Sequence, residues 1–259
     1  MGIAAENVRK LYLEGIAGGN ARAAVEQFTG HRYTQHSTGV GDGVEGFLTF
    51  LEPFLERNPD RHIEIVCLYE DGPWVFCSAY QSLNGGSAQW VTMDLFYTDS
   101  HGLILEHWDT IAAFATDTPS GNDMVGGTRD VDPNARTAST ANATKSLVLE
   151  FTKQVLQQGD LSKLDEFVDE NLVQHAATIE RGRDGLKQWI QSDACGDYEM
   201  LFQLIGDGDF AVTYGKRHAG GNDIAVFDIY RVADGKIVEH WMNEEVIGPR
   251  DQWGNSGKF

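Results

Sequence analysis

The stretch that decides the fold is Asp228-Ile-Tyr-Arg-Val-Ala-Asp-Gly-Lys-Ile-Val-Glu-His-Trp241, because the chain of 259 residues carries it twice. Its earlier copy is Asp94-Leu-Phe-Tyr-Thr-Asp-Ser-His-Gly-Leu-Ile-Leu-Glu-His-Trp108. A Gln-His pair precedes each copy, and a Gly-Asn pair follows each copy at Gly121-Asn122 and Gly254-Asn255. Landmarks that recur in one order indicate a duplicated unit of about 120 residues, a period longer than the roughly 20–50 residues of solenoid repeats.

Each copy reads as helices followed by strands. Apolar residues at helical spacing predict three helices per copy, at 4–17, 21–28 and 44–57, then at 145–157, 161–168 and 183–193. Four strands follow in each, at 63–69, 74–80, 89–98 and 103–112, then at 199–205, 210–217, 224–232 and 236–246. The turns Asp71-Gly72, Asp207-Gly208 and Asp234-Gly235 are strong hairpin signals. The pattern predicts an α+β fold with helices on the concave face of a curved, mostly antiparallel sheet.

A polar segment rich in Gly, Thr, Ser, Asn and Asp separates the two copies. Such composition is typical of a linker. We therefore expect a first domain at residues 1–125, a linker at 126–142 and a second domain at 143–259.

Composition restricts the class of partner. The formal net charge of −19 argues against binding nucleic acid or an anionic membrane surface, because both require basic surface. No run approaches the ~20 apolar residues of a membrane span, and the first residues do not resemble a secretory signal. The three cysteines are scattered, which favours reduced thiols. We expect a cytoplasmic protein with no nucleic-acid or membrane partner.

Hairpin register predicts which side chains share a face. If Asp234-Gly235 forms a two-residue turn, Asp228 lies opposite Trp241, and the first copy places Asp94 opposite Trp108. Both aspartates then lie on the concave face, while the histidines of the two Glu-His-Trp motifs, His107 and His240, face away. Burial disfavours the charged form of a carboxylate and can make it a base near neutral pH. The alternative is an aspartate that only accepts hydrogen bonds within the core.

The phrase D-[IL]-[FY]-x…D-G-x-I-x-E-H-W resembles SnoaL-like polyketide cyclases of the nuclear-transport-factor-2-like superfamily, with one copy in each half of this chain. The Gln-His element and the trailing Gly-Asn resemble a branch described as aldol-condensation enzymes. The resemblance implies two cone-shaped domains with pockets, fused as an intramolecular pseudo-dimer packed sheet against sheet. It leaves open whether the fused chain forms a further homo-oligomer.

The resemblance also implies roles for individual residues. The acid/base aspartate of the cyclases matches Asp94 and Asp228, and a histidine one strand earlier matches His218. The first copy has Asn84 at that position, where an amide could still donate to a developing oxyanion.

Further candidates follow from position. His36 and His175 are expected near the pocket mouth, either binding substrate or capping backbone groups. The aromatic residues Tyr80, Tyr214, Trp108 and Trp241 are expected to line the pocket or to pack in the core. We expect no metal site, because no metal-ligand spacing is present and the predicted faces of Asp94 and His107 diverge.

The resemblance favours a cofactor-free acid–base enzyme that acts on a small hydrophobic carbonyl compound, by aldol cyclisation, isomerisation or dehydration. The fold alone does not fix the reaction. One alternative is a non-catalytic protein that binds a small molecule in the same pocket. Another is a pair in which one copy only stabilises the other.

Overall fold

A computed structural model describes residues 2–259 and divides the chain into two compact units. Unit 1 extends to Phe114 and also contains Ile247–Phe259, and unit 2 is Ala115–Val246. Both units combine helices with one sheet, so the predicted α+β class and the two similar halves are confirmed.

The elements of unit 1 are α1 (Ile3–Lys10), a π-helical turn η1 (Leu11–Ala17), α2 (Ala21–Phe28), β1 (Thr29–Gln35), α3 (Gly43–Arg57), β2 (Arg61–Asp71), β3 (Trp74–Leu83), β4 (Ala88–Thr98), β5 (Ile104–Ala113) and η4 (Arg250–Gln252). Those of unit 2 are α4 (Ala138–Phe151), η2 (Thr152–Gln157), η3 (Leu161–Lys163), α5 (Leu164–Phe167), β6 (Val168–Gln174), α6 (Gly182–Ile190), β7 (Asp197–Asp207), β8 (Phe210–Ala219), β9 (Asn222–Ala233) and β10 (Lys236–Val246). Among residues 2–259, no helix has both the length and the apolar character that a membrane crossing requires.

Each sheet has five strands, one more than the predicted meander. The strand order is β1-β5-β4-β3-β2 in unit 1 and β6-β10-β9-β8-β7 in unit 2. The additional strand carries the Gln-His pair and lies parallel to the last strand of its unit. Its sequence in unit 1, TGHRYTQ, is largely polar, so hydrophobic alternation gave no signal for it.

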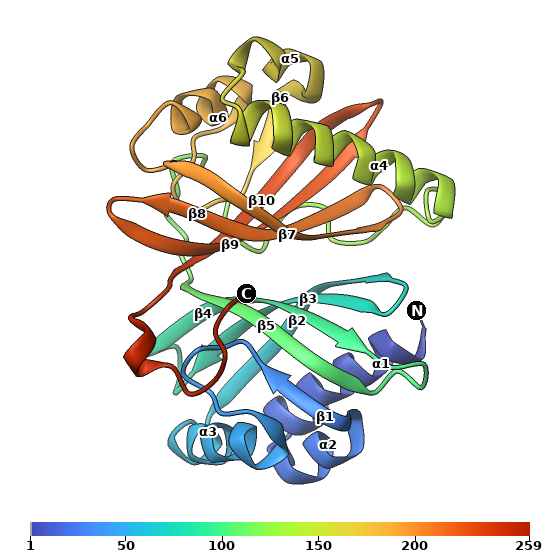
Figure 1. Ribbon diagram of the computed structural model, residues 1–259, viewed down its shortest axis with the longest axis vertical. Coiled ribbons are helices and arrows are strands. Elements are labelled where there is room, and N and C mark those ends of the chain that lie inside the picture. Colours follow the sequence, from blue (N-terminus) through green and yellow to red (C-terminus); the bar gives the residue numbers. More distant parts are fainter. Residues whose placement is uncertain (1) are drawn as a thin grey trace. The chain divides into compact units, whose positions relative to one another are not determined.

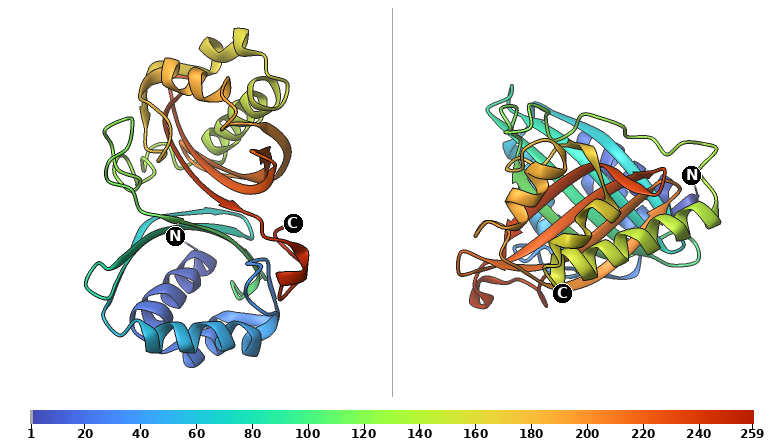
Figure 2. Two further views of the ribbon diagram at one scale, coloured as in Figure 1. Left: turned by 90° about the vertical axis from the view of Figure 1, so that its left-hand side faces the viewer. Right: turned by 90° about the horizontal axis from the view of Figure 1, so that it is seen from above.

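The helices of each unit cover one face of the sheet (Figure 1). In unit 1 this face is concave, as the left view of Figure 2 shows. Val8, Leu11 and Tyr12 are buried, as their helical spacing predicts, and pack in a core with Phe47, Leu48 and other apolar residues. One apolar helix face on one sheet face is therefore the basis of each unit.

Two segments, each following the last strand of a sheet, belong to compact units, whereas the sequence had predicted a linker at 126–142. Residues 115–142 pack within unit 2, where the indole Nε1 of Trp241 donates to the carbonyl oxygen of Gly126 at 3.0 Å. Residues 247–259 pack within unit 1, where Asn255 donates to the carbonyl oxygen of Ser37 at 2.6 Å. These units therefore divide the chain differently from the sequence-based limits at 125 and 143, and sheet-against-sheet packing stays a prediction.

Candidate functional site

A β-bulge decides which residues of β5 face the helices. The ladder between β4 and β5 shifts after Tyr97, so that Asp94 pairs with Asp109 and Phe96 pairs with His107. The predicted partner of Asp94, Trp108, was one residue off. One extra residue in a strand turns every later side chain to the other face. His107 therefore lies on the same face as Asp94, and the prediction that it faces away is wrong.

The strand pairing in unit 2 departs from the prediction in the same way. The ladder between β9 and β10 shifts between Ile237 and Glu239, which pairs Asp228 with Met242 and Tyr230 with His240. The predicted pairing of Asp228 with Trp241 is therefore also wrong.

Four buried side chains of unit 1 form a hydrogen-bonded chain. Asp94 Oδ1 lies 2.8 Å from His107 Nε2, and His107 Nδ1 lies 2.9 Å from Gln35 Oε1. The amide of Gln35 donates to the Tyr33 hydroxyl at 2.8 Å. Phe96 stacks on the imidazole of His107. The arrangement holds the carboxylate, the imidazole and the amide in fixed order, which suits a proton-transferring pair.

The second oxygen of Asp94 is buried and makes no hydrogen bond. Asp94 is only 4% exposed, and it lies in the wall of the cavity described below. The nearby Tyr12 hydroxyl lies 3.4 Å from Thr92 Oγ1. Burial, followed by the negative charge of Asp94, raises the pKa of Tyr12 well above its usual value. Tyr12 is therefore a protonated donor that interacts with the carboxylate of Asp94.

A cavity of about 300 Å³ opens beside these groups in unit 1. This volume is at the lower end of the range for small-molecule sites. Its apolar wall comes from Leu11, Tyr12, Ile16, Tyr33, Val40, Phe47, Phe50, Leu51, Phe54, Trp90, Phe96 and Ile111, and its polar side chains are Gln35, Ser37, Gln81, Thr92, Asp94, His107 and Asp109. Phe50, Trp90 and Ile111 are each more than one-third exposed. The cavity is therefore apolar, with a polar end built around Asp94 and His107.

Asp109 brings a second carboxylate to the polar end. Its Oδ1 accepts a hydrogen bond at 2.8 Å from the ammonium of Lys258. Ligand atoms of Asp94, His107 and Asp109 all lie within 4.8 Å of one another, a spacing that could hold a metal ion. The expectation of no metal site rested partly on diverging faces for Asp94 and His107, and that premise is wrong. The cation that contacts Asp109 is the side-chain ammonium of Lys258.

The equivalent chain of unit 2 is fully satisfied. Asp228 Oδ1 lies 2.9 Å from His240 Nε2, and Gln174 Nε2 lies 2.9 Å from His240 Nδ1. Asp228 Oδ2 accepts from the hydroxyls of Tyr198 at 3.3 Å and Thr213 at 3.5 Å. Unit 2 therefore keeps the aspartate–histidine–glutamine chain but supplies protein donors to both carboxylate oxygens.

An arginine fills the concave face of unit 2. Arg217 is 1% exposed and stacks over the rings of Trp189 and Tyr198, at 5.3 Å and 5.7 Å from the ring centroids. Its guanidinium donates to the carbonyl oxygens of Ala194 and Cys195 and pairs with Glu244. The strand position equivalent to Arg217 in unit 1 is Gln81, a cavity wall residue.

The two Gln-His histidines lie on the opposite sheet face from the aspartates. His36 stacks on Trp108 with ring centroids 4.5 Å apart, and His175 stacks on Trp241 at 4.8 Å. Neither His36 nor Trp108 lines the cavity of unit 1. In unit 1 the structure therefore places His36 and Trp108 outside the cavity wall, and Trp108 is buried in the protein interior.

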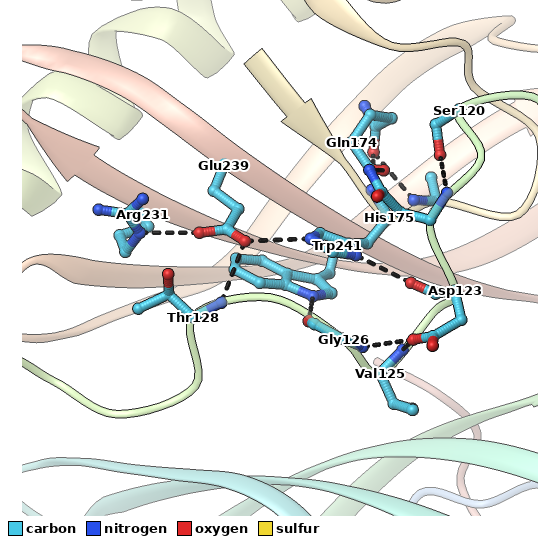
Figure 3. Close-up of polar contacts among 12 residues, drawn as sticks. Ser120, Asp123, Val125, Gly126, Thr128, Gln174, His175, Arg231, Glu239 and Trp241 are labelled. Atoms are coloured by element: carbon cyan, nitrogen blue, oxygen red, sulfur yellow. Dashed lines mark hydrogen bonds and ion pairs between the residues drawn. The ribbon is translucent and has the colours of Figure 1, made fainter. Parts of the chain in front are cut away.

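Figure 3 shows the polar cluster around His175, which we call the unit 2 clasp: His175, Glu239, Arg231, Trp241 and the backbone of residues 123–128. Glu239 accepts from His175 at 3.0 Å, from Arg231 at 2.9 Å and from the Thr128 amide at 3.1 Å. Burial alone would raise the pKa of Glu239, but these donors outweigh it and lower the pKa to about 2. The clasp holds the segment after β5 in place.

Asn84 and Tyr80 of unit 1 do not line its cavity. In unit 2, His218 is partly exposed near the end of β8 and pairs with Asp223 at 2.9 Å. Asn84 is exposed in a turn with a φ of 49° and donates to Asn58. Tyr80 donates to Gln89 at 3.0 Å, and Tyr214 stacks on Phe227. Tyr214 is adjacent to Thr213, which contacts Asp228, so its side chain is on the opposite face.

Sequence reasoning did not select His107, Gln35, Tyr33 or Asp109 as site residues. The available signal was a break in alternation before each Glu-His-Trp motif, at Leu103-Ile104-Leu105 and Ile237-Val238. Consecutive apolar residues in a half-buried strand are consistent with a bulge.

Comparisons with known proteins give one family match and several similar solved structures. Residues 148–240 match the family model of the SnoaL-like domain. Similar solved structures include a protein from Bacillus cereus assigned as a polyketide cyclase, with 19% identity, 42% of this chain and 73% of that chain covered, and a TM-score of 0.37. A protein from Kribbella flavida assigned as a ketosteroid isomerase has 18% identity, coverage of 43% and 86%, and a TM-score of 0.38. An NTF-2 like protein of unknown function from Burkholderia xenovorans has 16% identity, coverage of 45% and 96%, and a TM-score of 0.36. No curated protein matches the chain.

Proposed function

Because the chain carries a SnoaL-like domain in residues 148–240 and repeats its sheet topology in unit 1, we propose that unit 1 is a cofactor-free acid–base enzyme for a small hydrophobic carbonyl compound. The reaction begins with removal of a proton from the carbon next to the carbonyl group. Aldol cyclisation, isomerisation and dehydration can all proceed from the resulting enolate.

The observation that carries the proposal is the unpartnered oxygen of Asp94, a residue that lines the cavity. A buried acceptor left without a hydrogen bond destabilises a protein by about 1–3 kcal/mol. A ligand or a reaction that uses the group is one explanation for such an acceptor. In unit 2, Tyr198 and Thr213 donate to the equivalent oxygen, so the fold itself does not require an aspartate oxygen without a hydrogen bond.

Neighbouring side chains supply the remaining roles. Asp94 Oδ2 accepts the substrate proton, while His107 holds Oδ1 and Gln35 fixes the imidazole. The protonated hydroxyl of Tyr12 donates to the developing enolate oxygen. The apolar wall excludes water from the reacting groups.

The test is exchange of carbon-bound hydrogen for deuterium. A panel of small aryl ketones and cyclic 1,3-diketones is incubated with the protein in D₂O, and loss of the α-proton signal is followed by NMR. Asp94→Asn should lower the protein-dependent exchange rate by about 10²–10⁴-fold, the usual contribution of general base catalysis. Asp228→Asn is the matched control and should leave the rate within about threefold.

Equal loss in both variants, or full activity in Asp94→Asn, would contradict the proposal. The alternative function, a binding protein without turnover, predicts a different pattern. Ligands would raise the melting temperature of the wild type, yet no ketone would exchange faster than in buffer.

A further inference from the structure

Lys258 is a buried cation next to the polar end of the cavity. It is 1% exposed, and its ammonium donates to both the side-chain Oδ1 and the backbone carbonyl oxygen of Asp109, each at 2.8 Å. Asp109 in turn lies in the cavity wall with Asp94 and His107. Lys258 therefore contacts a residue of the cavity wall, the carboxylate of Asp109.

The segment that carries Lys258 is held at several points in unit 1. Asn255 donates to the carbonyl oxygens of Ser37 and Val40, at 2.6 Å and 2.9 Å. The carbonyl oxygen of Gly257 lies 2.7 Å from His36 Nδ1. Gly257 has a φ of 104°, and a Cβ there would come within 2.3 Å of the Trp253 ring. This backbone turn thus needs glycine, and it sets the position of the next residue, Lys258.

Unit 2 lacks both partners of this ion pair. Met242 occupies the strand position of Asp109 and pairs with Asp228 as Asp109 pairs with Asp94. Counted from the Gly-Asn pair, Val125 corresponds to Lys258. A buried ion pair is often no more stabilising than apolar residues of similar size. Because unit 2 has apolar residues at both positions, packing alone does not explain the pair in unit 1.

We propose that Lys258 is a positioning residue of the unit 1 site: its ammonium, 2.8 Å from Asp109 Oδ1, fixes Asp109 so that Asp94 is the carboxylate that exchanges a proton with the substrate. This inference rests on the proposed function of unit 1. The chain thereby supplies its own cation to a site with two carboxylates. Lys258 does not itself contact the substrate.

The charges around Asp109 support this division of roles. Burial would raise the pKa of Asp109, but the ammonium of Lys258, helped by His107, outweighs burial and lowers it. The other titratable groups facing this part of the site are Asp94, Tyr12 and Tyr33, together with Cys77, which is buried next to Asp94. Two buried carboxylates whose environments differ are a common basis for separate catalytic roles.

The first test needs no substrate. The carboxyl carbon of Asp109 is followed by ¹³C NMR over pH in wild type, Lys258→Met and Lys258→Arg, and Asp109→Asn assigns the signal. Loss of the cation should raise the pKa of Asp109 by about 1–3 pH units, and Lys258→Arg should restore at least half of that difference. An unchanged titration in Lys258→Met would overturn the inference whether or not unit 1 is an enzyme.

The second test transplants the residues of unit 2. The double variant Asp109→Met with Lys258→Val should fold with a melting temperature no lower than the wild type, yet lose at least tenfold in the ketone exchange rate. Lys258→Arg should retain most of the exchange rate. Full exchange activity in the folded double variant would contradict the positioning role, and it would leave the role of Asp94 intact.

Discussion

The two units share an aspartate–histidine–glutamine chain, but they differ in what surrounds it. In unit 1 the second oxygen of Asp94 has no hydrogen-bond partner and lies in a cavity wall. In unit 2 the same oxygen of Asp228 has two hydroxyl donors, and Arg217 fills the concave face. The difference teaches that a repeated motif can have different surroundings: protein donors satisfy both carboxylate oxygens of Asp228, whereas one oxygen of Asp94 has no such donor.

Helix length underlies part of this difference. Helix α3 of unit 1 has 15 residues, whereas α6 of unit 2 has 9. Because α6 is the shorter helix, the chain leaves it sooner than it leaves α3. The carbonyl groups of Ala194 and Cys195 then accept hydrogen bonds from the guanidinium of Arg217. The longer α3 instead contributes Phe50 and Phe54 to the cavity wall.

The largest expected effect comes from making unit 2 resemble unit 1 at Arg217. Arg217→Gln installs the residue found at Gln81 and should lower the free energy of unfolding by about 3–5 kcal/mol, because Glu244 and two carbonyl groups lose a buried partner. Urea denaturation measures the change. Arg250→Gln, an exposed arginine stacked on Trp253, is the control and should change stability by less than about 1 kcal/mol.

Acid should weaken unit 2 through the clasp. The pKa of Glu239 is lowered from 4.5 to about 2, so its contribution to stability is complete above pH 4.5 and is lost as the pH falls toward 2. Glu239→Gln should remove this part of the pH dependence, about 2–3 kcal/mol between those limits.

The control for the clasp is Glu106→Gln in unit 1. The partner of Glu106, Arg32, is about half exposed, so this substitution should lower stability by less than about 1 kcal/mol. Urea denaturation at pH 6, 4 and 3 makes the comparison. A pH dependence in Glu239→Gln equal to that of wild type would show that the clasp is not the acid-sensitive element.

The aspartates themselves should differ in their effect on stability. Asp228→Asn replaces a carboxylate that has three hydrogen-bonding partners and should lower the free energy of unfolding by about 1–3 kcal/mol. Asp94→Asn should lower it by less than half as much, because one oxygen of Asp94 has no hydrogen bond to lose. The reverse order would contradict the distinction between a structural and a functional aspartate.

Sequence was informative about the fold because its signals are local. Asp-Gly turns, helical spacing and the duplicated motif predict the hairpins, the helices and the two similar halves. Strand β1 was missed because its residues are polar, and the face of His107 was wrong because one bulge reverses the register. Lys258 contacts Asp109 across 149 residues of chain, a pairing that no local pattern encodes. The aspartates could therefore be named from the sequence, whereas their surroundings required the structure.

The central claim, that unit 1 holds the open pocket, is tested most directly by locating a bound ketone with tryptophan fluorescence. Trp90 lines the unit 1 cavity, and Trp189 is packed under Arg217 in unit 2. A ketone that stabilises the wild type should change its emission, Trp90→Phe should abolish most of that change, and Trp189→Phe should preserve it. A response that survives in Trp90→Phe and disappears in Trp189→Phe would place the ligand in unit 2 and contradict the account.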